Sequence, residues 1–297
     1  MPAIEDAVAA AGTFLIGGDL RVHRLGYGAM RLTGPGGWGE PADPAVAPAL
    51  LRRAVTLGID FIDTAEAYGP EVNERQIADA LHPYPPELVI ATKGGLRRTL
   101  TAGEAAPGSE IQGSAAAIRS AVEGSLRRLR VETIALYQLH RLDPRVPMAE
   151  TLGALDDLRR AGKIRHIGLS EVSVAELAAA RAITPIATVQ NRYNLRQRRH
   201  DPVLAACEAA GIGFMPWYPL GGGPSALAGD AAVVEVAGRH GCTCSQVALA
   251  WLLARSPVML PIPGTASIAH LDENAGAGHV RLDAGDMALL DRTEEHR

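Results

Sequence analysis

The chain of 297 residues is 47% hydrophobic and 21% charged, the composition of an ordinary soluble globular protein. Its formal net charge of −4 gives no basic footprint for nucleic acid, and its longest strongly apolar helical stretch, 247–254, is too short to span a membrane. The N-terminus lacks the basic region of a signal peptide, and three cysteines argue against a disulfide framework. These features predict a cytoplasmic protein.

The first predicted element is a β-hairpin in TFLIGGDLRVHRLG, residues 13–26, which turns around Gly17, Gly18 and Asp19. Its two strands are too short to belong to the main sheet of the fold. We therefore expect the hairpin to lie across one end of the fold, the bottom, although a plain glycine loop is the alternative.

Short apolar runs alternate with helical patterns along the rest of the chain. The helical segments include 44–58, 114–130, 148–163 and 173–183, and Ser114 and Ser173 are predicted N-caps. The apolar runs are 24–32, 61–65, 88–94, 134–140, 164–170, 186–191, 213–219 and 258–264. Strands separated by helices indicate a parallel sheet.

This alternation predicts an α/β fold, a (β/α)₈ TIM barrel in a single domain over 1–297, since about 250 residues is typical of that fold. A doubly wound open sheet is the alternative. That fold usually places GxGxxG after its first strand, whereas LTGPGGWG follows here with a different glycine spacing.

Polar or hydrogen-bonding residues end most of the apolar runs. Strands of a parallel barrel are covered on both faces and should be apolar throughout, and active sites form at their C-terminal ends. Helix capping would explain an Asp or a Ser at these places, but not a Lys, a His and a Gln as well. The strand-end residues are Asp63, Lys93, His140, Ser170, Gln190 and Trp217.

The types of residue at these ends suggest carbonyl chemistry. A Lys93 ammonium beside the Tyr68 phenol should lower a pKa that is ordinarily about 10, and Asp63 should hold Lys93 in place. His140 would donate a hydrogen bond to an acceptor oxygen. Because no residue is an obvious nucleophile, hydride from a nicotinamide is the natural partner for this set.

Seven motifs in the same order and spacing resemble those of the aldo-keto reductases. They are FIDTAEAYG, ATKGG, YQLHRLDP, IGLSEVS, VQNRYN, PWYPLGGG and IPGTASIAHLDEN, and the resemblance runs from Leu25 to Asn274. It implies a barrel enzyme that binds NADP(H) without a Rossmann fold. It also implies a catalytic tetrad of Asp63, Tyr68, Lys93 and His140, with Tyr68 as the general acid.

The resemblance also assigns binding residues. Trp217 takes the place of the aromatic ring, usually Tyr, that stacks on the nicotinamide. Tyr68 and His140 would contact the substrate, and Tyr27 and Trp38 after the first strand are candidates for its pocket, with a packing role as the alternative. The cofactor-binding residues are Gly28, Met30, Ser170, Gln190, Trp217, Leu220, Gly221, Gly222, Gly264, Thr265, His270, Glu273 and Asn274.

Two departures from the family pattern bear on cofactor binding. Glu171 stands where the family commonly has Asn, and we expect its carboxylate to point to solvent. Gly264 and His270 replace a Lys and an Arg that hold the 2′-phosphate in some members, which leaves hydrogen bonds from Thr265, Ser267 and His270. NADPH is therefore preferred over NADH in this interpretation, with a weaker phosphate clamp.

The composition of the loops gives little information about the substrate and the partners. Arg97 and Arg98 follow Lys93 and would either favour an anionic aldehyde or face water. We expect an open site for small carbonyl compounds, no membrane or nucleic-acid partner, and no metal. A monomer is slightly favoured, although no pattern fixes the oligomeric state. The alternatives are an NADP(H)-binding redox-sensing subunit with slow turnover, and a metal-dependent hydrolase, for which His140 would be the only strand-end His.

Overall fold

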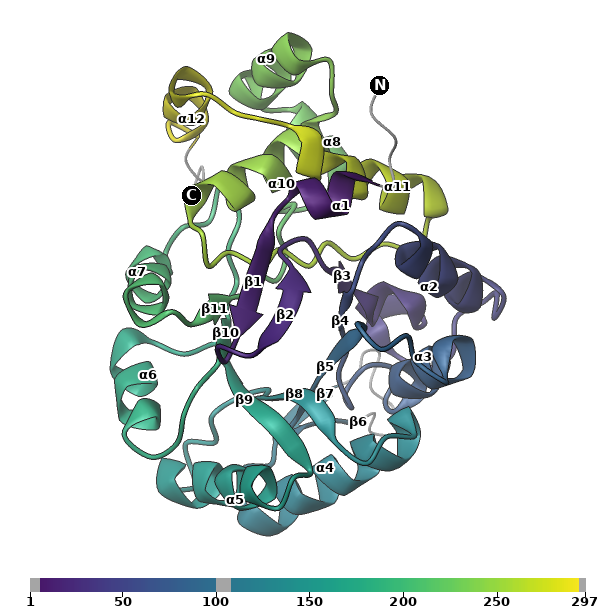
Figure 1. Cartoon of the computed structure of the whole chain (residues 1–297), viewed down its shortest axis with the longest axis vertical. Helices are drawn as coiled ribbons and strands as arrows, with labels where there is room; N and C mark the ends of the chain where they lie inside the picture. Colours follow the sequence, from purple (N-terminus) through teal and green to yellow (C-terminus); the bar gives the residue numbers. More distant parts are fainter. Residues whose placement is uncertain (1–5, 100–107, 294–297) are drawn as a thin grey trace.

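A ring of parallel strands surrounded by helices forms the protein, as predicted for a TIM barrel (Figure 1). The computed structural model describes residues 6–99 and 108–293. Its parallel sheet has the strand order β11-β10-β9-β8-β5-β4-β3. The strands are β3 (Tyr27–Gly28), β4 (Phe61–Asp63), β5 (Val89–Gly94), β8 (Ile134–Leu139), β9 (Ile164–Ser170), β10 (Thr188–Gln190) and β11 (Gly213–Phe214).

The eighth predicted run, 258–264, closes the ring without forming a regular strand. Pro261 and Pro263 lack the N–H groups that a ladder requires. Their carbonyls instead accept from Gly26 N at 3.0 Å and Gly28 N at 3.3 Å, next to β3. On the other side Leu260 N donates to Phe214 O at 2.8 Å. The first predicted run is also shorter as a strand than expected, because β3 passes directly into the 3₁₀ helix η2 (Ala29–Leu32).

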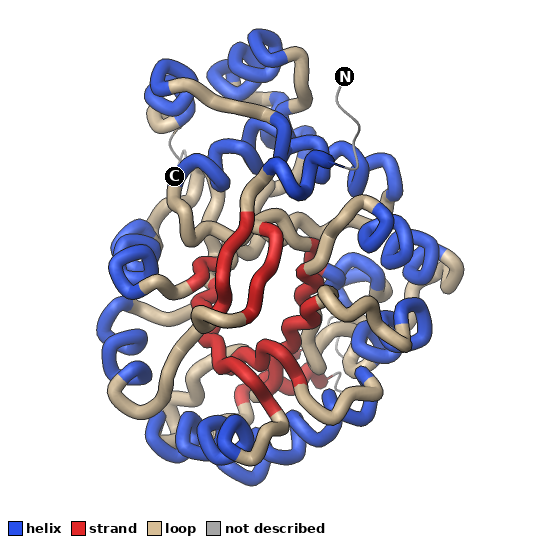
Figure 2. The backbone as a smooth tube through the Cα atoms, viewed as in Figure 1, coloured by secondary structure: helices blue, strands red, loops and turns tan. Residues whose placement is uncertain are grey.

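Helices form the outer layer around the strands (Figure 2). The predicted N-caps are confirmed: Ser114 Oγ accepts from Ala117 N, and Ser173 Oγ accepts from Glu176 N. The principal helices are α2 (Val46–Thr56), α3 (Val72–Leu81), α4 (Ala115–Leu129), α5 (Met148–Arg160), α6 (Val174–Arg181), α7 (Asp201–Ala210), α9 (Ala231–His240), α10 (Cys244–Arg255) and α11 (Ile268–Gly276). The shorter helices are α1 (Ala7–Ala10), η3 (Pro35–Gly37), α8 (Pro224–Ala228), η4 (Ala277–His279) and α12 (Ala284–Leu290).

The predicted hairpin covers the bottom of the barrel. Strands β1 (Thr13–Ile16) and β2 (Leu20–His23) pair antiparallel, and Figure 1 shows them across the ring of strands. Ile16 and Val22 are fully buried among side chains from the early parts of the barrel strands, including Phe61 and Val89. A second antiparallel pair, β6 (Leu96–Thr99) and β7 (Gly108–Ile111), follows β5. Among the described helices, none is long and apolar enough to cross a membrane.

Candidate active site

Lys93 stands at the centre of the polar strand ends. It lies in β5 and is fully buried. Its Nζ donates to Asp63 Oδ2 at 2.6 Å, to the backbone oxygen of Thr64 at 2.8 Å and to Tyr68 Oη at 3.2 Å. An ammonium has three N–H donors, so these bonds use all of them. Lys93 therefore acts on Tyr68 and has no donor left for a ligand.

The second oxygen of Asp63 is also fully engaged. Asp63 Oδ1 accepts from Gln138 Nε2 and from Gln190 Nε2, each at 3.0 Å. Gln190 lines the cavity, but its amide nitrogen is committed to Asp63. Gln138 is missing from the sequence-based site. A polar residue inside the apolar run of β8, two places before His140, is the signal that pointed to it.

Burial and charge act in opposite directions on the Tyr68 phenol. Burial raises its pKa, while the Lys93 ammonium lowers it, and burial is the larger effect. The net pKa is raised, contrary to the lowering expected from Lys93 alone. Burial also disfavours the charge on Lys93, but Asp63 and Tyr68 together raise the pKa of the ammonium. The pair therefore consists of a protonated phenol beside a charged ammonium, a state suited to donating a proton.

His140 faces the same phenol from the end of β8. Its ring centroid lies 6.1 Å from that of Tyr68 in an edge-to-face arrangement. Burial, together with the charges of Lys93, Arg141 and Arg98, lowers the pKa of His140 well below its ordinary 6.5. Nδ1 of His140 is buried without a hydrogen-bond partner among the described residues. The neutral imidazole retains one N–H that can be donated to a carbonyl oxygen.

A cavity of about 1150 Å³ opens above these residues. Asp63, Tyr68 and His140 line it, with Lys93 directly behind them. Every residue predicted to bind a cofactor also lines it. These residues are Gly28, Met30, Ser170, Gln190, Trp217, Leu220, Gly221, Gly222, Gly264, Thr265, His270, Glu273 and Asn274. The cavity is somewhat larger than typical ligand sites, which have volumes of about 300–1,000 Å³.

Tyr27, a predicted substrate-pocket residue, does not line the cavity. Side chains alternate along a strand, so Gly28 faces the cavity and Tyr27 faces the opposite side. Tyr27 is fully buried in the core, and its hydroxyl donates to Thr265 O at 2.7 Å. Trp38 is the second predicted substrate-pocket residue that lies outside the cavity wall. Trp38 is half-buried at the end of η3 and is absent from the cavity wall, which is formed there by Pro35, Gly36, Gly37 and Pro41.

Two glycines allow a close approach of backbones at the cavity. A Cβ on Gly28 would lie 2.7 Å from Ile262 O, and a Cβ on Gly264 would lie 2.7 Å from Gly28 O. A side chain at either position would therefore collide with backbone. The backbone at Gly222 has φ 114°, which L-residues rarely adopt. These positions leave backbone, rather than side chains, exposed along this part of the wall.

Arg31 is a cavity residue that the sequence analysis missed. It lies in η2, and its Cγ is 3.6 Å from the place where a Cβ on Gly264 would be. The structure thus places the aliphatic stem of Arg31 beside Gly264, where the sequence alone indicated no basic residue. Thr265 Oγ1 accepts from Ser267 N, and Ser267 Oγ accepts from His270 N. Both oxygens act as acceptors in these bonds, so each hydroxyl keeps an O–H that can donate to a ligand.

The loop arginines after Lys93 differ in position. Arg98 lines the cavity, and its Nη1 donates to Gly36 O at 2.7 Å and to Gly37 O at 3.2 Å, whereas Arg97 is absent from the wall. Arg141, which follows His140, is a further missed cavity residue. Its Nη1 donates to His140 O at 2.6 Å and to Ser170 Oγ at 3.0 Å.

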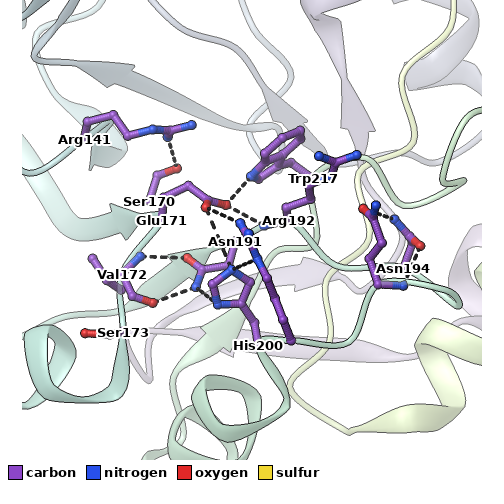
Figure 3. A network of polar contacts seen from close by, with 12 residues as sticks. Arg141, Ser170, Glu171, Val172, Ser173, Asn191, Arg192, Asn194, His200 and Trp217 are labelled. Carbon is purple, nitrogen blue, oxygen red and sulfur yellow. Dashed lines mark hydrogen bonds and ion pairs between the residues drawn. The ribbon is translucent and has the colours of Figure 1, made fainter. Parts of the chain in front are cut away.

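Glu171 does not point to solvent, contrary to expectation. Its side chain is only 16% exposed, and Oε1 accepts from Trp217 Nε1 and from Arg192 N, each at 2.6 Å (Figure 3). The carboxylate is held away from water because two N–H donors converge on it from the segments that follow β10 and β11. Glu171 is therefore part of the wall that supports Trp217.

No metal centre accompanies this site. Within residues 6–99 and 108–293, no group of three or more His, Cys, Asp or Glu side chains is arranged to hold a metal ion. Cys207 is buried, and Cys242 and Cys244 are half-buried free thiols.

Comparison with known proteins places this geometry in a family. The model of the aldo/keto reductase family matches residues 24–295. The chain is 46% identical over 283 residues to an uncharacterised oxidoreductase of Schizosaccharomyces pombe, covering 95% of this chain and 89% of that protein. It is 40% identical over 288 residues to pyridoxine 4-dehydrogenase of Escherichia coli K12, covering 95% and 98%.

A solved structure agrees with the sequence relatives. The aldo-keto reductase from Klebsiella pneumoniae in complex with NADPH superimposes with a TM-score of 0.81 at 28% identity, and 96% of each chain is covered. The fold, the family model and the two relatives therefore lead to one conclusion. The chain belongs to the aldo-keto reductase family.

Proposed function

We propose that this protein reduces aldehydes or ketones to alcohols with NADPH, and that Tyr68 is the general acid. One observation carries the proposal: Tyr68 Oη, at the cavity wall, lies 3.2 Å from the Lys93 ammonium, which is itself paired with Asp63. NADPH, when bound, supplies the hydride to the carbonyl carbon. The proton for the carbonyl oxygen comes from Tyr68.

Each member of the tetrad has a separate task in this proposal. Tyr68 donates its proton, and Lys93 stabilises the phenolate that remains. Asp63 keeps Lys93 charged and aligned, while Gln138 and Gln190 fix the carboxylate of Asp63. Neutral His140 donates a hydrogen bond to the substrate oxygen, on which negative charge grows during reduction.

The residues along the cavity fit NADP(H). Gly28 and Gly264 leave no room for side chains, so backbone alone borders that region. Ser170 and Gln190 provide polar groups for a carboxamide, and Trp217 provides an aromatic face. Arg31 is a basic residue of the cavity wall whose stem lies beside Gly264, and this supports the preference for NADPH over NADH. NADPH in the Klebsiella pneumoniae relative supports the same assignment.

The substrate is proposed as a small carbonyl compound. The cavity volume of about 1150 Å³ gives no narrower limit on the size of the substrate. The panel for testing should include a simple aromatic aldehyde, an aliphatic ketone and pyridoxal. Pyridoxal is included because of the relationship to pyridoxine 4-dehydrogenase. None of the relatives reported above supports the alternative of a redox-sensing subunit.

The test is to titrate the purified protein with NADPH and with NADH, and then to add each carbonyl compound while following nicotinamide absorbance. Tighter binding of NADPH, followed by its oxidation on addition of an aldehyde, is expected. Binding without oxidation across the panel would favour the sensing subunit. Failure to bind either nucleotide would overturn the proposal.

A further inference from the structure

Trp217 is held at its ring edge by a single carboxylate. Its Nε1 donates to Glu171 Oε1 at 2.6 Å, and the same oxygen accepts from Arg192 N at 2.6 Å (Figure 3). Hydrogen bonds to ionised acceptors are shorter and stronger than those between neutral groups. The indole therefore has a preferred orientation that depends on Glu171.

Glu171 is itself constrained at both its backbone and its side chain. It follows β9 with φ 57°, a left-handed conformation that is uncommon outside glycine, and its N–H donates to Gln190 O at 3.0 Å. Its second carboxylate oxygen lies 3.4 Å from Arg199 Nη2 and 3.9 Å from His200 Nε2. Turning the carboxylate to solvent would break contacts on both oxygens.

The face of the indole is also linked to Glu171, through Arg192. The guanidinium of Arg192 lies 5.5 Å from the ring of Trp217 and 4.8 Å from the ring of Tyr218. Because Arg192 N donates to Glu171, one carboxylate holds both the edge of the indole and the residue beside its face. Trp217 lines the cavity from this fixed position.

We propose that Glu171 is a positioning residue that pre-orients Trp217 to receive the nicotinamide ring. This inference rests on the proposed function, in which Trp217 stacks on that ring. Glu171 and Trp217 both depart from the usual family residues, and in this structure they are bonded to each other. A tyrosine ring has no N–H at that edge, so the two departures form one functional pair.

Pre-orientation acts on binding through conformational entropy. A side chain that is already fixed loses little rotamer freedom when a ligand packs on it. Removing the Glu171 carboxylate should release the indole and weaken NADPH binding by about tenfold, the factor that corresponds to about 1.4 kcal/mol. This loss of NADPH affinity should occur only when the Trp217 N–H is present.

A double-mutant cycle tests this requirement with the full-length protein. Glu171→Ala, Trp217→Phe and the double variant are titrated with NADPH by calorimetry. Glu171→Ala should weaken binding about tenfold when Trp217 is present, and by less than about twofold when Phe replaces it, the limit for independent sites. An equal loss in both backgrounds would overturn the inference, because Glu171 would then act by another route.

Fluorescence of the nucleotide-free protein provides a second readout. Glu171→Ala should change the tryptophan emission and anisotropy when Trp217 is present, and should leave the Trp217→Phe protein unchanged. The same change in both backgrounds, which would arise at Trp38 or Trp251, would contradict the pairing. Glu171→Gln retains an acceptor oxygen but loses the charge, so it should recover part of the affinity, which a purely electrostatic role would not allow.

Controls separate this inference from the proposed function. Glu176→Ala removes a nearby carboxylate that caps α6 and should leave NADPH affinity unchanged. Thermal unfolding of each variant identifies general destabilisation. If wild-type protein does not bind NADPH, both the proposed function and this role for Glu171 are overturned. If it binds and the cycle is additive, the inference about Glu171 alone is overturned.

Discussion

The two ends of the barrel differ in the chemistry of the side chains that point into it. Residues two places apart on a strand share a face. At the bottom, Phe61 of β4 and Val89 and Ala91 of β5 are buried with the hairpin. At the top, the next inward positions on the same strands are Asp63 and Lys93, which form an ion pair at 2.6 Å. On each strand, two neighbouring inward-facing positions thus differ in kind. The lower one packs against apolar side chains, and the upper one belongs to the proposed proton-donating site.

The comparison teaches that stability and activity have different locations in this molecule. The hairpin closes the bottom with apolar side chains such as Ile16 and Val22, whose burial favours folding. The top contains buried charged and polar groups whose burial is costly unless they are paired. We therefore expect substitutions at the top to lower turnover with little change in stability. Substitutions at the bottom should lower stability with little change in turnover.

The largest expected effect is at the top. Tyr68→Phe removes the proposed proton donor while keeping the ring, and should lower the reduction rate by about 10²–10⁴-fold. NADPH affinity and unfolding temperature should change little. Steady-state rates with an aldehyde, combined with calorimetric titration, measure both quantities. Full activity in this variant would show that Tyr68 is not the proton donor. It would also weaken the proposed difference in function between the two ends of the barrel.

The matching change at the bottom is Ile16→Ala in the hairpin. Ile16 is fully buried, so the cavity left behind should lower the free energy of unfolding by about 2–5 kcal/mol. The turnover number should stay within about twofold of wild type at temperatures where the protein is folded, as expected for distant sites. Chemical denaturation and kinetics test this. A large loss of turnover with unchanged stability would contradict the separation.

A smaller effect is expected at the rim of the top end. Arg31→Gln removes a basic residue of the cavity wall and should weaken NADPH binding by about tenfold, with a smaller loss for NADH. The difference should shrink at high salt, because exposed charges are screened. Titrations with both nucleotides at two salt concentrations decide this. Equal losses of affinity for NADPH and NADH would show that Arg31 does not interact with the 2′-phosphate.

The smallest expected effect is the response to pH between about 5.5 and 8. Because burial, Lys93, Arg141 and Arg98 keep the pKa of His140 well below 6.5, the reduction rate should show no step near that value. A step that disappears in His140→Gln would show a charged imidazole in the folded site.

The same shift in pKa predicts a dependence of stability on pH. Below about 6.5, His140 takes up a proton in the unfolded chain but remains neutral in the folded one. The contribution of His140 is therefore complete above 6.5 and is lost as the pH falls toward its folded-state pKa. Unfolding of wild type and His140→Gln across this range should show a shallower decline for the variant.

Much of the fold and the tetrad could be predicted from sequence because local patterns carry them. Apolar runs, glycine stops and serine caps mark the barrel units, and the polar residues that end those runs share one end of a parallel sheet. Tyr27 was misplaced because β3 has only two residues, too few to fix which residue faces inward. Gln138 broke an apolar run, which was a readable but overlooked signal.

The remaining errors concern contacts between distant segments. Glu171 and Trp217 are 46 residues apart, so no local pattern pairs them. Arg31 meets Gly264 only because the last run closes the barrel beside β3. The direction of the Tyr68 pKa shift depended on the burial of the phenol in the folded chain, which outweighs the Lys93 charge. Each of these three features depends on how distant segments pack in the folded chain.

The most direct test of hydride transfer at the top of the barrel uses NADPH carrying deuterium at C4 of the nicotinamide, on one face or the other. Wild-type protein should transfer the label from one of the two forms to the carbonyl carbon of an aromatic aldehyde and retain it in the other. Mass spectrometry of the alcohol measures this. An unlabelled alcohol from both forms, or no alcohol at all, would contradict the account.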